Sequence, residues 1–154
     1  MGGERSTRPV RVHYEDTDAA GVAYHAGYLR FLERARTEWL RDLGFEQDRL
    51  MREEGTVFAV AGLKLDFLKP ARFNDRFFVD VVLIQLGLAS LTLAHSITRL
   101  ASARQPDPRE PVTHEAITRE TDREVLRGTV RRVFKSRACL DAGLRPKSLP
   151  PSLL

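Results

Sequence analysis

The sequence predicts an α+β fold, in which one antiparallel β-sheet packs against one long helix. Apolar residues recur at helical spacing over residues 26–43, and the segments after it have the composition or the alternation of β-strands. The connections between these strands favour antiparallel neighbours. With 154 residues, 42% of them hydrophobic, the chain is long enough for one domain with a substantial core.

A short strand and the long helix open the chain. Val10–Tyr14 alternates apolar and polar residues, which is typical of a half-buried strand. The helix is predicted to begin at His25 or Ala26 and to end at Leu43, where Gly44 supplies a left-handed stop. At about 1.5 Å per residue it is roughly 27 Å long, enough to cross a curved sheet.

The helix has one apolar face and one charged face. The residues predicted to be buried are Tyr28, Leu29, Leu32, Ala35, Trp39 and Leu43. The other side is predicted to face solvent, with Arg36 exposed and Arg34 paired with Glu38 as an i,i+4 ion pair.

The rest of the chain is predicted to be mostly strands. A short helix over Gln47–Glu53 ends before Gly55. The predicted strands are Val57–Leu68, Phe77–Leu86, Leu91–Leu100 and Val125–Phe134. The second of these is almost continuously apolar, which indicates a central strand buried on both faces. Gly87–Ser90 is predicted to form the tight turn that follows it.

One long connection interrupts the strands. Residues 101–121 are polar, charged and rich in proline. A connection of this length is uncommon in a compact domain, so we expect an inserted hairpin extension or a mobile loop. The whole chain, 1–154, is otherwise predicted to be one domain.

Composition and charge exclude several classes of protein. No apolar run is long enough to span a membrane, and the polar N-terminus does not resemble a signal peptide, so we expect a cytoplasmic protein. Cys139 is the single cysteine, and no spacing predicts a metal site. The net charge of +4 favours anionic partners, but no nucleic-acid-binding motif accompanies it.

The most informative stretch is the loop between the first strand and the long helix. Tyr14–His25 contains three acidic residues, Glu15, Asp16 and Asp18, directly before the helix begins. A carboxylate beside the open N–H groups of a helix N-terminus combines a base or nucleophile with an electropositive pocket. The alternative is structural, because aspartate commonly caps helices and closes turns.

The residue pattern Asp16–Tyr28, continuing into Phe31–Glu38, resembles the signature of hotdog-fold acyl-CoA thioesterases. Within that superfamily it is most similar to the 4-hydroxybenzoyl-CoA thioesterase group, and nearest to the bacterial thioesterases associated with the Tol-Pal system. The resemblance is dense over Val10–Leu43. It implies a sheet wrapped around the long helix, and homodimers that share a continuous sheet and often form homotetramers.

The resemblance also implies roles for individual residues. It places the catalytic carboxylate at Asp18, acting as nucleophile or as general base, and leaves Asp16 a structural role. The N–H groups around Tyr24 and His25 would polarise the thioester carbonyl, and the His25 side chain would bind the carbonyl or position water. Gly21 and Val22 would contact the substrate. No cofactor is implied.

The acyl carrier is less clearly implied. Related thioesterases place basic residues at the turn corresponding to Gly87–Ser90, where they contact the coenzyme A phosphates. Here that turn has none, although Ser90 stays a substrate-binding candidate. Lys69, Arg72 or the cluster Arg131–Lys135 are the alternative phosphate ligands, and an acyl carrier protein is the alternative carrier. A non-catalytic acyl- or pantetheine-binding module and a protein-interaction module are the competing functions.

Overall fold

A computed structural model of the protein describes residues 5–100 and 124–136, with the side chains of 131–136 excepted. The elements in chain order are β1 (Ser6–Arg11), the 3₁₀ helix η1 (Tyr14–Asp16), α1 (Gly27–Asp42), α2 (Gln47–Glu54), β2 (Thr56–Phe67), β3 (Arg76–Leu86), β4 (Ser90–Arg99) and β5 (Glu124–Ser136). The segment 101–121 and Cys139 lie outside the described residues.

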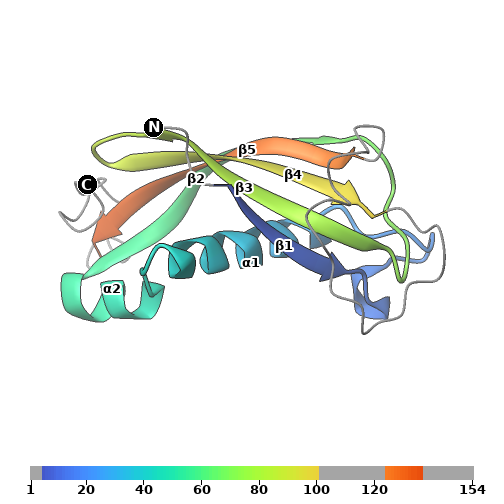
Figure 1. Ribbon diagram of the computed structural model, residues 1–154, viewed down its shortest axis with the longest axis horizontal. Helices are drawn as coiled ribbons and strands as arrows, with labels where there is room; N and C mark the ends of the chain where they lie inside the picture. The colour runs from blue at the N-terminus through green and yellow to red at the C-terminus, as the bar shows by residue number, and fades with distance from the viewer. Residues whose placement is uncertain (1–4, 101–123, 137–154) are drawn as a thin grey trace.

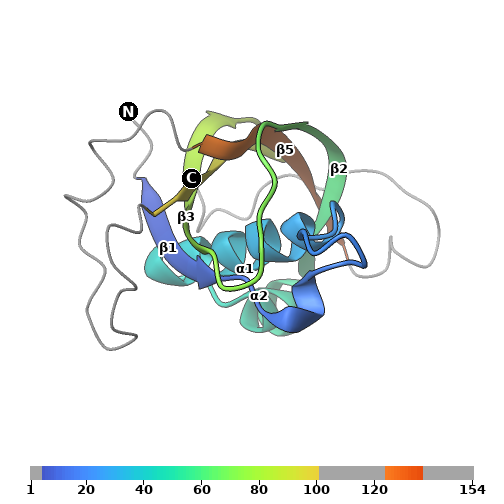
Figure 2. The same ribbon diagram turned by 90° about the vertical axis from the view of Figure 1, so that its right-hand side faces the viewer.

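The five strands form one sheet in the order β1-β3-β4-β5-β2, and every neighbouring pair is antiparallel. The sheet curves around α1, which lies along its concave face (Figures 1 and 2). Within the described residues β1 and β2 are the edges of the sheet. The predicted α+β arrangement of one long helix on one antiparallel sheet is confirmed.

The core lies between α1 and the concave face of the sheet. Its most deeply buried side chains are Phe31, Leu32, Leu40, Phe77, Val79, Val81, Leu93, Ile97, Val125 and Leu126. Because the sheet wraps around α1, it covers more of the helix than one narrow stripe. Three predictions for this helix are wrong: Arg36 is buried and paired with Glu33, whereas Leu29 and Leu43 are exposed.

The first strand lies earlier in the chain than predicted. β1 pairs with β3 from Ser6 to Arg11. Val12 then leaves the ladder, and its N–H donates to the carbonyl of Asp75 at 2.9 Å while its own carbonyl accepts the Asn74 N–H at 3.0 Å. These two bonds fix the segment that follows β1 against the connection that precedes β3.

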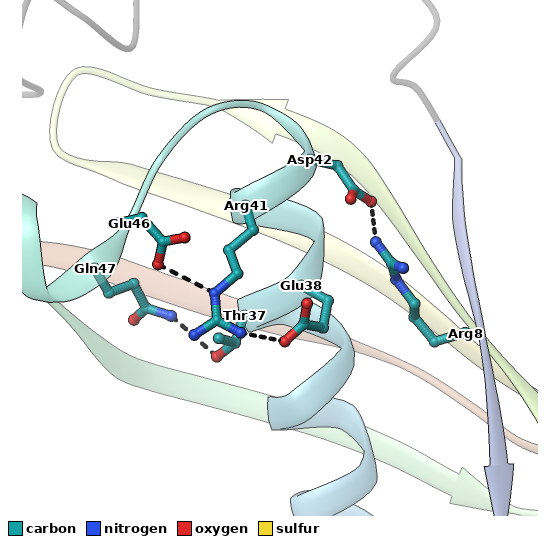
Figure 3. A network of polar contacts seen from close by, with 7 residues as sticks. All are labelled: Arg8, Thr37, Glu38, Arg41, Asp42, Glu46 and Gln47. Atoms are coloured by element: carbon teal, nitrogen blue, oxygen red, sulfur yellow. Dashed lines mark hydrogen bonds and ion pairs between the residues drawn. The ribbon is translucent and has the colours of Figure 1, made fainter.

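Surface ion pairs join the end of α1 to its neighbours (Figure 3). Arg41 contacts Glu38 and Glu46, and Arg8 of β1 contacts Asp42. The sequence predicted a pair between Glu38 and Arg34. In the structure Glu38 pairs with Arg41 instead. Exposed pairs of this kind typically contribute less than about 1 kcal/mol each, so the core remains the main source of stability.

Asp80, in the middle of β3, is the one acidic residue among the buried side chains of that strand. Its carboxylate accepts hydrogen bonds from Arg5 Nε at 3.0 Å, Thr7 Oγ1 at 2.6 Å and Ser96 Oγ at 3.1 Å. Burial acts to raise its pKa, but the bonds from these groups and the charge of Arg5 outweigh burial and hold the pKa below its ordinary value.

We expect Asp80→Ala to lower the free energy of unfolding by about 2 kcal/mol at pH 7, because three donors lose a charged acceptor. The estimate is modest because Arg5 is half exposed. A lowered folded-state pKa stabilises the protein above about pH 4, and this stabilisation is lost as the pH falls through the folded-state value. Urea unfolding between pH 7 and pH 3 is the measurement.

The difference between wild type and Asp80→Ala should therefore shrink as the pH is lowered. Asp42→Ala is the matched control, because it removes an exposed carboxylate from a surface pair and should cost less than about 1 kcal/mol. A difference for Asp80→Ala that is constant across this pH range would contradict the assigned role of its charge.

Candidate active site

The loop between β1 and α1 folds back on itself around Asp18. The Asp18 N–H donates to the Val22 carbonyl at 2.9 Å, and the Gly21 N–H donates to the Asp18 carbonyl at 2.9 Å. Gly21 has a φ of 73°, in the left-handed region that favours glycine. The result is a tight turn that carries an exposed Asp18 at the end of the molecule that faces the viewer in Figure 2.

The two oxygens of the Asp18 carboxylate have different surroundings. Oδ1 accepts the Ala20 N–H at 2.8 Å, the bond of an aspartate that stabilises its own turn. Within the described part of the chain, no hydrogen-bond donor contacts Oδ2. The structural and the catalytic interpretations are therefore compatible, because one oxygen holds the turn while the other is open to a reactant.

Asp16, the other aspartate of the pair, is only 5% exposed. Its carboxylate accepts the His13 N–H at 2.8 Å and lies 3.3 Å from the guanidinium of Arg30 in α1. Its main-chain carbonyl accepts the Tyr24 N–H at 3.0 Å. Asp16 thus connects the end of β1, the segment before α1 and α1 itself, in agreement with a structural role.

The start of α1 provides fewer open donors than the sequence suggested. The helix begins at Gly27, after the N-cap residue Ala26. The Tyr24 N–H is engaged with Asp16, so it is unable to polarise a substrate carbonyl. No residue in 5–100 or 124–136 accepts the N–H of His25, so that group stays open. The rings of Tyr24 and His25 contact each other, with centroids 4.3 Å apart.

An open pocket of about 270 Å³ lies beside this donor. Its walls are Val22, Ala23, His25, Tyr28, Phe67, Leu68, Lys69 and Pro70. They come from the loop, the first turn of α1, the end of β2 and the segment that follows β2. The pocket is mainly apolar, with a histidine and a lysine on its walls. Asp18 lies on the same loop but not on the wall of this pocket.

Tyr28 lines the pocket, whereas the sequence predicted only that it is buried in the core. Its hydroxyl oxygen accepts the Ala71 N–H at 3.1 Å, and its ring packs edge-on against Phe67 at 5.6 Å. Burial raises the pKa of its hydroxyl. The helical periodicity showed that Tyr28 points inward, but not that the pocket reaches it, because Phe67 and Ala71 come from distant parts of the chain.

The remaining predicted residues are divided between the two ends of the molecule. Lys69 lies on the pocket wall, and the backbone of Arg72 pairs with that of Val22. Ser90 lies at the turn between β3 and β4, at the end opposite the Asp18 loop (Figure 1). Within one chain the structure therefore does not bring Ser90 to this site. The side chains of Arg131–Lys135 lie outside the described residues.

Two negative findings concern only residues 5–100 and 124–136. Over these ranges no three His, Cys, Asp or Glu side chains gather closely enough to hold a metal ion. No helix in these ranges has the length and apolar character needed to cross a membrane.

Comparisons with known proteins identify relatives of this chain. Over 91 residues the chain is 44% identical to the acyl-CoA thioesterase YbgC of Haemophilus influenzae, an alignment that covers 59% of this chain and 67% of that protein. It is 44% identical over 89 residues to the acyl-CoA thioester hydrolase YbgC of Escherichia coli O157:H7, an alignment that covers 58% of this chain and 66% of that protein. The chain thus spans about two thirds of the length of these relatives.

Solved structures share the fold. A probable thioesterase from Bartonella henselae superposes with a TM-score of 0.74 and 25% identity, covering 96% of this chain and 100% of that one. A 4-hydroxybenzoyl-CoA thioesterase variant in complex with 4-hydroxybenzoyl-CoA superposes with a TM-score of 0.74 and 20% identity. The superposition covers 96% of this chain and 94% of that one. These likenesses confirm the predicted hotdog fold. The family model of the thioesterase-like superfamily matches residues 12–154, and the chain belongs to that superfamily.

Proposed function

We propose that this protein hydrolyses the thioester bond of acyl-CoA substrates, with Asp18 as nucleophile or general base. One observation carries the proposal: an exposed carboxylate with an open oxygen lies on the same loop as the unpaired N–H of His25, and His25 lines an apolar pocket. The names of the relatives support it, since they include acyl-CoA thioesterases and a 1,4-dihydroxy-2-naphthoyl-CoA hydrolase.

The chemistry assigns a separate task to each group. The His25 N–H, two residues before α1, donates to the thioester oxygen as negative charge develops on it. As a general base, Asp18 removes a proton from water, whose oxygen attacks the carbonyl carbon. The C–S bond then breaks, the proton goes to the thiolate, and the products are a carboxylic acid and free coenzyme A. As a nucleophile, Asp18 attacks the carbonyl carbon, the C–S bond breaks and coenzyme A leaves as a thiolate that takes a proton from solvent. Water then hydrolyses the acyl-enzyme anhydride to the carboxylic acid and free Asp18.

A second copy of the chain completes the site in this proposal. β2 is a twelve-residue edge strand, and its Val60, Leu63 and Phe67 are about half exposed. A long edge with apolar side chains favours pairing with another strand, and two-fold pairing of β2 with its copy would extend the sheet across the dimer. In such a dimer the partner chain would cover the pocket, which is open in the single chain.

We therefore expect light scattering to give at least twice the 17.5 kDa mass of the chain. Leu63→Lys should shift the population toward the monomer, because it places a charge at the centre of the exposed edge. Lys64→Ala, at the next position of β2, is the control. A wild type that stays monomeric at micromolar concentration would contradict the dimeric site.

The direct test of function is thiol release from a panel of short, long and aromatic acyl-CoAs. At least one class should be turned over, and the preferred class would identify the substrate. Because acyl-CoA is made and used inside cells, we place this activity in the cytoplasm. If folded protein releases no thiol from any acyl-CoA or from acyl carrier protein thioesters, the proposed function is wrong.

A further inference from the structure

An exposed pair of aromatic rings lies beside the candidate active site. Tyr14 of η1 is 81% exposed and Phe73, before β3, is 51% exposed. Their ring centroids are 6.1 Å apart and the rings are perpendicular. Single exposed apolar residues are ordinary on protein surfaces, but two adjoining aromatic rings beside a pocket are typical of a binding surface.

The backbone holds these rings in place. The Val12 N–H and carbonyl bond to Asp75 and Asn74, which joins the two segments that carry the rings. The Tyr14 carbonyl accepts the Thr17 N–H at 3.1 Å and the Thr17 hydroxyl at 2.7 Å. The aromatic pair is therefore a preformed platform, which costs little conformational entropy when a ligand binds.

Phe73 lies close to the pocket along the chain, and the segment that carries it is net basic. Phe73 follows Pro70 of the pocket wall by three residues, a separation of at most about 10 Å along the chain. Residues 69–76 include three basic residues and one acidic residue. Arg72 is exposed, and within the described ranges no carboxylate pairs with its guanidinium. Asp75, the acidic residue, is paired with Arg99 at 3.1 Å.

We propose that Tyr14, Phe73 and Arg72 bind the adenine nucleotide end of coenzyme A. Adenine would stack on the face of one ring with the edge of the other ring beside it, and Arg72 would pair with a phosphate group, while the pantetheine arm leads into the pocket. The inference rests on the proposed function and makes it more specific, because an acyl carrier protein has no adenine to stack. It assigns coenzyme A as the carrier.

The test measures binding of adenosine 3′,5′-bisphosphate by calorimetry, which needs no turnover. Tyr14→Leu and Phe73→Leu keep apolar bulk but remove the rings, and each should weaken binding roughly tenfold, within the range for loss of one base-stacking contact. Arg72→Gln should weaken it further at low salt. Thermal melting confirms that the variants are folded.

Kinetics with two carriers provides the second readout. The variants should raise KM for an acyl-CoA by a similar factor and leave hydrolysis of the matching acyl-N-acetylcysteamine, which lacks the nucleotide, within about twofold of wild type. Leu88→Ser, at an exposed leucine on the β3–β4 turn, is the control and should change neither.

Two results would overturn the subsite. One is a set of folded variants that bind adenosine 3′,5′-bisphosphate as tightly as wild type. The other is a wild type that does not bind this nucleotide at all. Either result leaves acyl-CoA hydrolysis intact if thiol release is still observed, so the subsite and the proposed function fail separately.

Discussion

Replacing Asp18 by asparagine should reduce turnover of acyl-CoA at least about a hundredfold, the scale expected for losing a general base. The substitution removes the negative charge but keeps an amide oxygen that still accepts the Ala20 N–H. The turn should therefore persist, and the melting temperature should change little. Thiol release by wild type and variant at equal concentrations of folded protein is the measurement.

The variant should still bind its substrate. Because the His25 N–H and the apolar pocket are unchanged, we expect its Kd for the acyl-CoA to lie within about threefold of the wild-type value. Asp48→Asn, which changes an exposed carboxylate on α2, is the matched control and should keep full activity. An Asp18→Asn variant that retains more than about a tenth of wild-type turnover would contradict the assignment of Asp18.

Gly128→Ala should be the most damaging single-methyl change in the described sheet. An added Cβ would lie 2.1 Å from the Lys64 carbonyl oxygen and 2.7 Å from the Leu65 side chain. Gly128 pairs with His95 on one side and Leu65 on the other, so β5 is held between β4 and β2 and has little room to move. We expect a loss of about 3 kcal/mol or more.

Thermal unfolding tests this expectation, with a predicted fall in melting temperature of roughly 10 °C. Gly62→Ala is the control, because no atom lies within 4 Å of its added Cβ and its φ is not in the left-handed region. A Gly128→Ala variant that melts within about 2 °C of wild type would contradict the close contact between β2 and β5 at this point.

The sequence was most informative where local rules decide the structure. Gly44 and Gly55 end their helices with positive φ, as predicted from glycine after a helical segment. β4 was predicted as the strand Leu91–Leu100, and it alternates as a half-buried strand should, with Leu91, Leu93 and His95 buried on one face. The loop Tyr14–His25 was singled out from its composition and its place before α1, since turn chemistry and capping act over only a few residues, and its catalytic role stays a prediction.

The errors arose where distant segments decide the outcome. Val12 leaves the sheet because Asn74 and Asp75 take its backbone bonds, a contact that no local pattern records. Arg36 is buried because the sheet wraps around α1. The N–H of Tyr24 was predicted to polarise the substrate carbonyl, but in the structure it donates to the carbonyl of Asp16. Each of these depends on tertiary packing, which overrides local preference.

The most direct test of the central claim is product analysis in H₂¹⁸O. Wild-type protein is incubated with its preferred acyl-CoA, and free coenzyme A and carboxylic acid are quantified by mass spectrometry. Hydrolysis predicts equal amounts of the two products over many turnovers, with ¹⁸O in the carboxylic acid. Substrate that is bound but returned intact would contradict the account and identify the protein as a non-catalytic acyl-binding module.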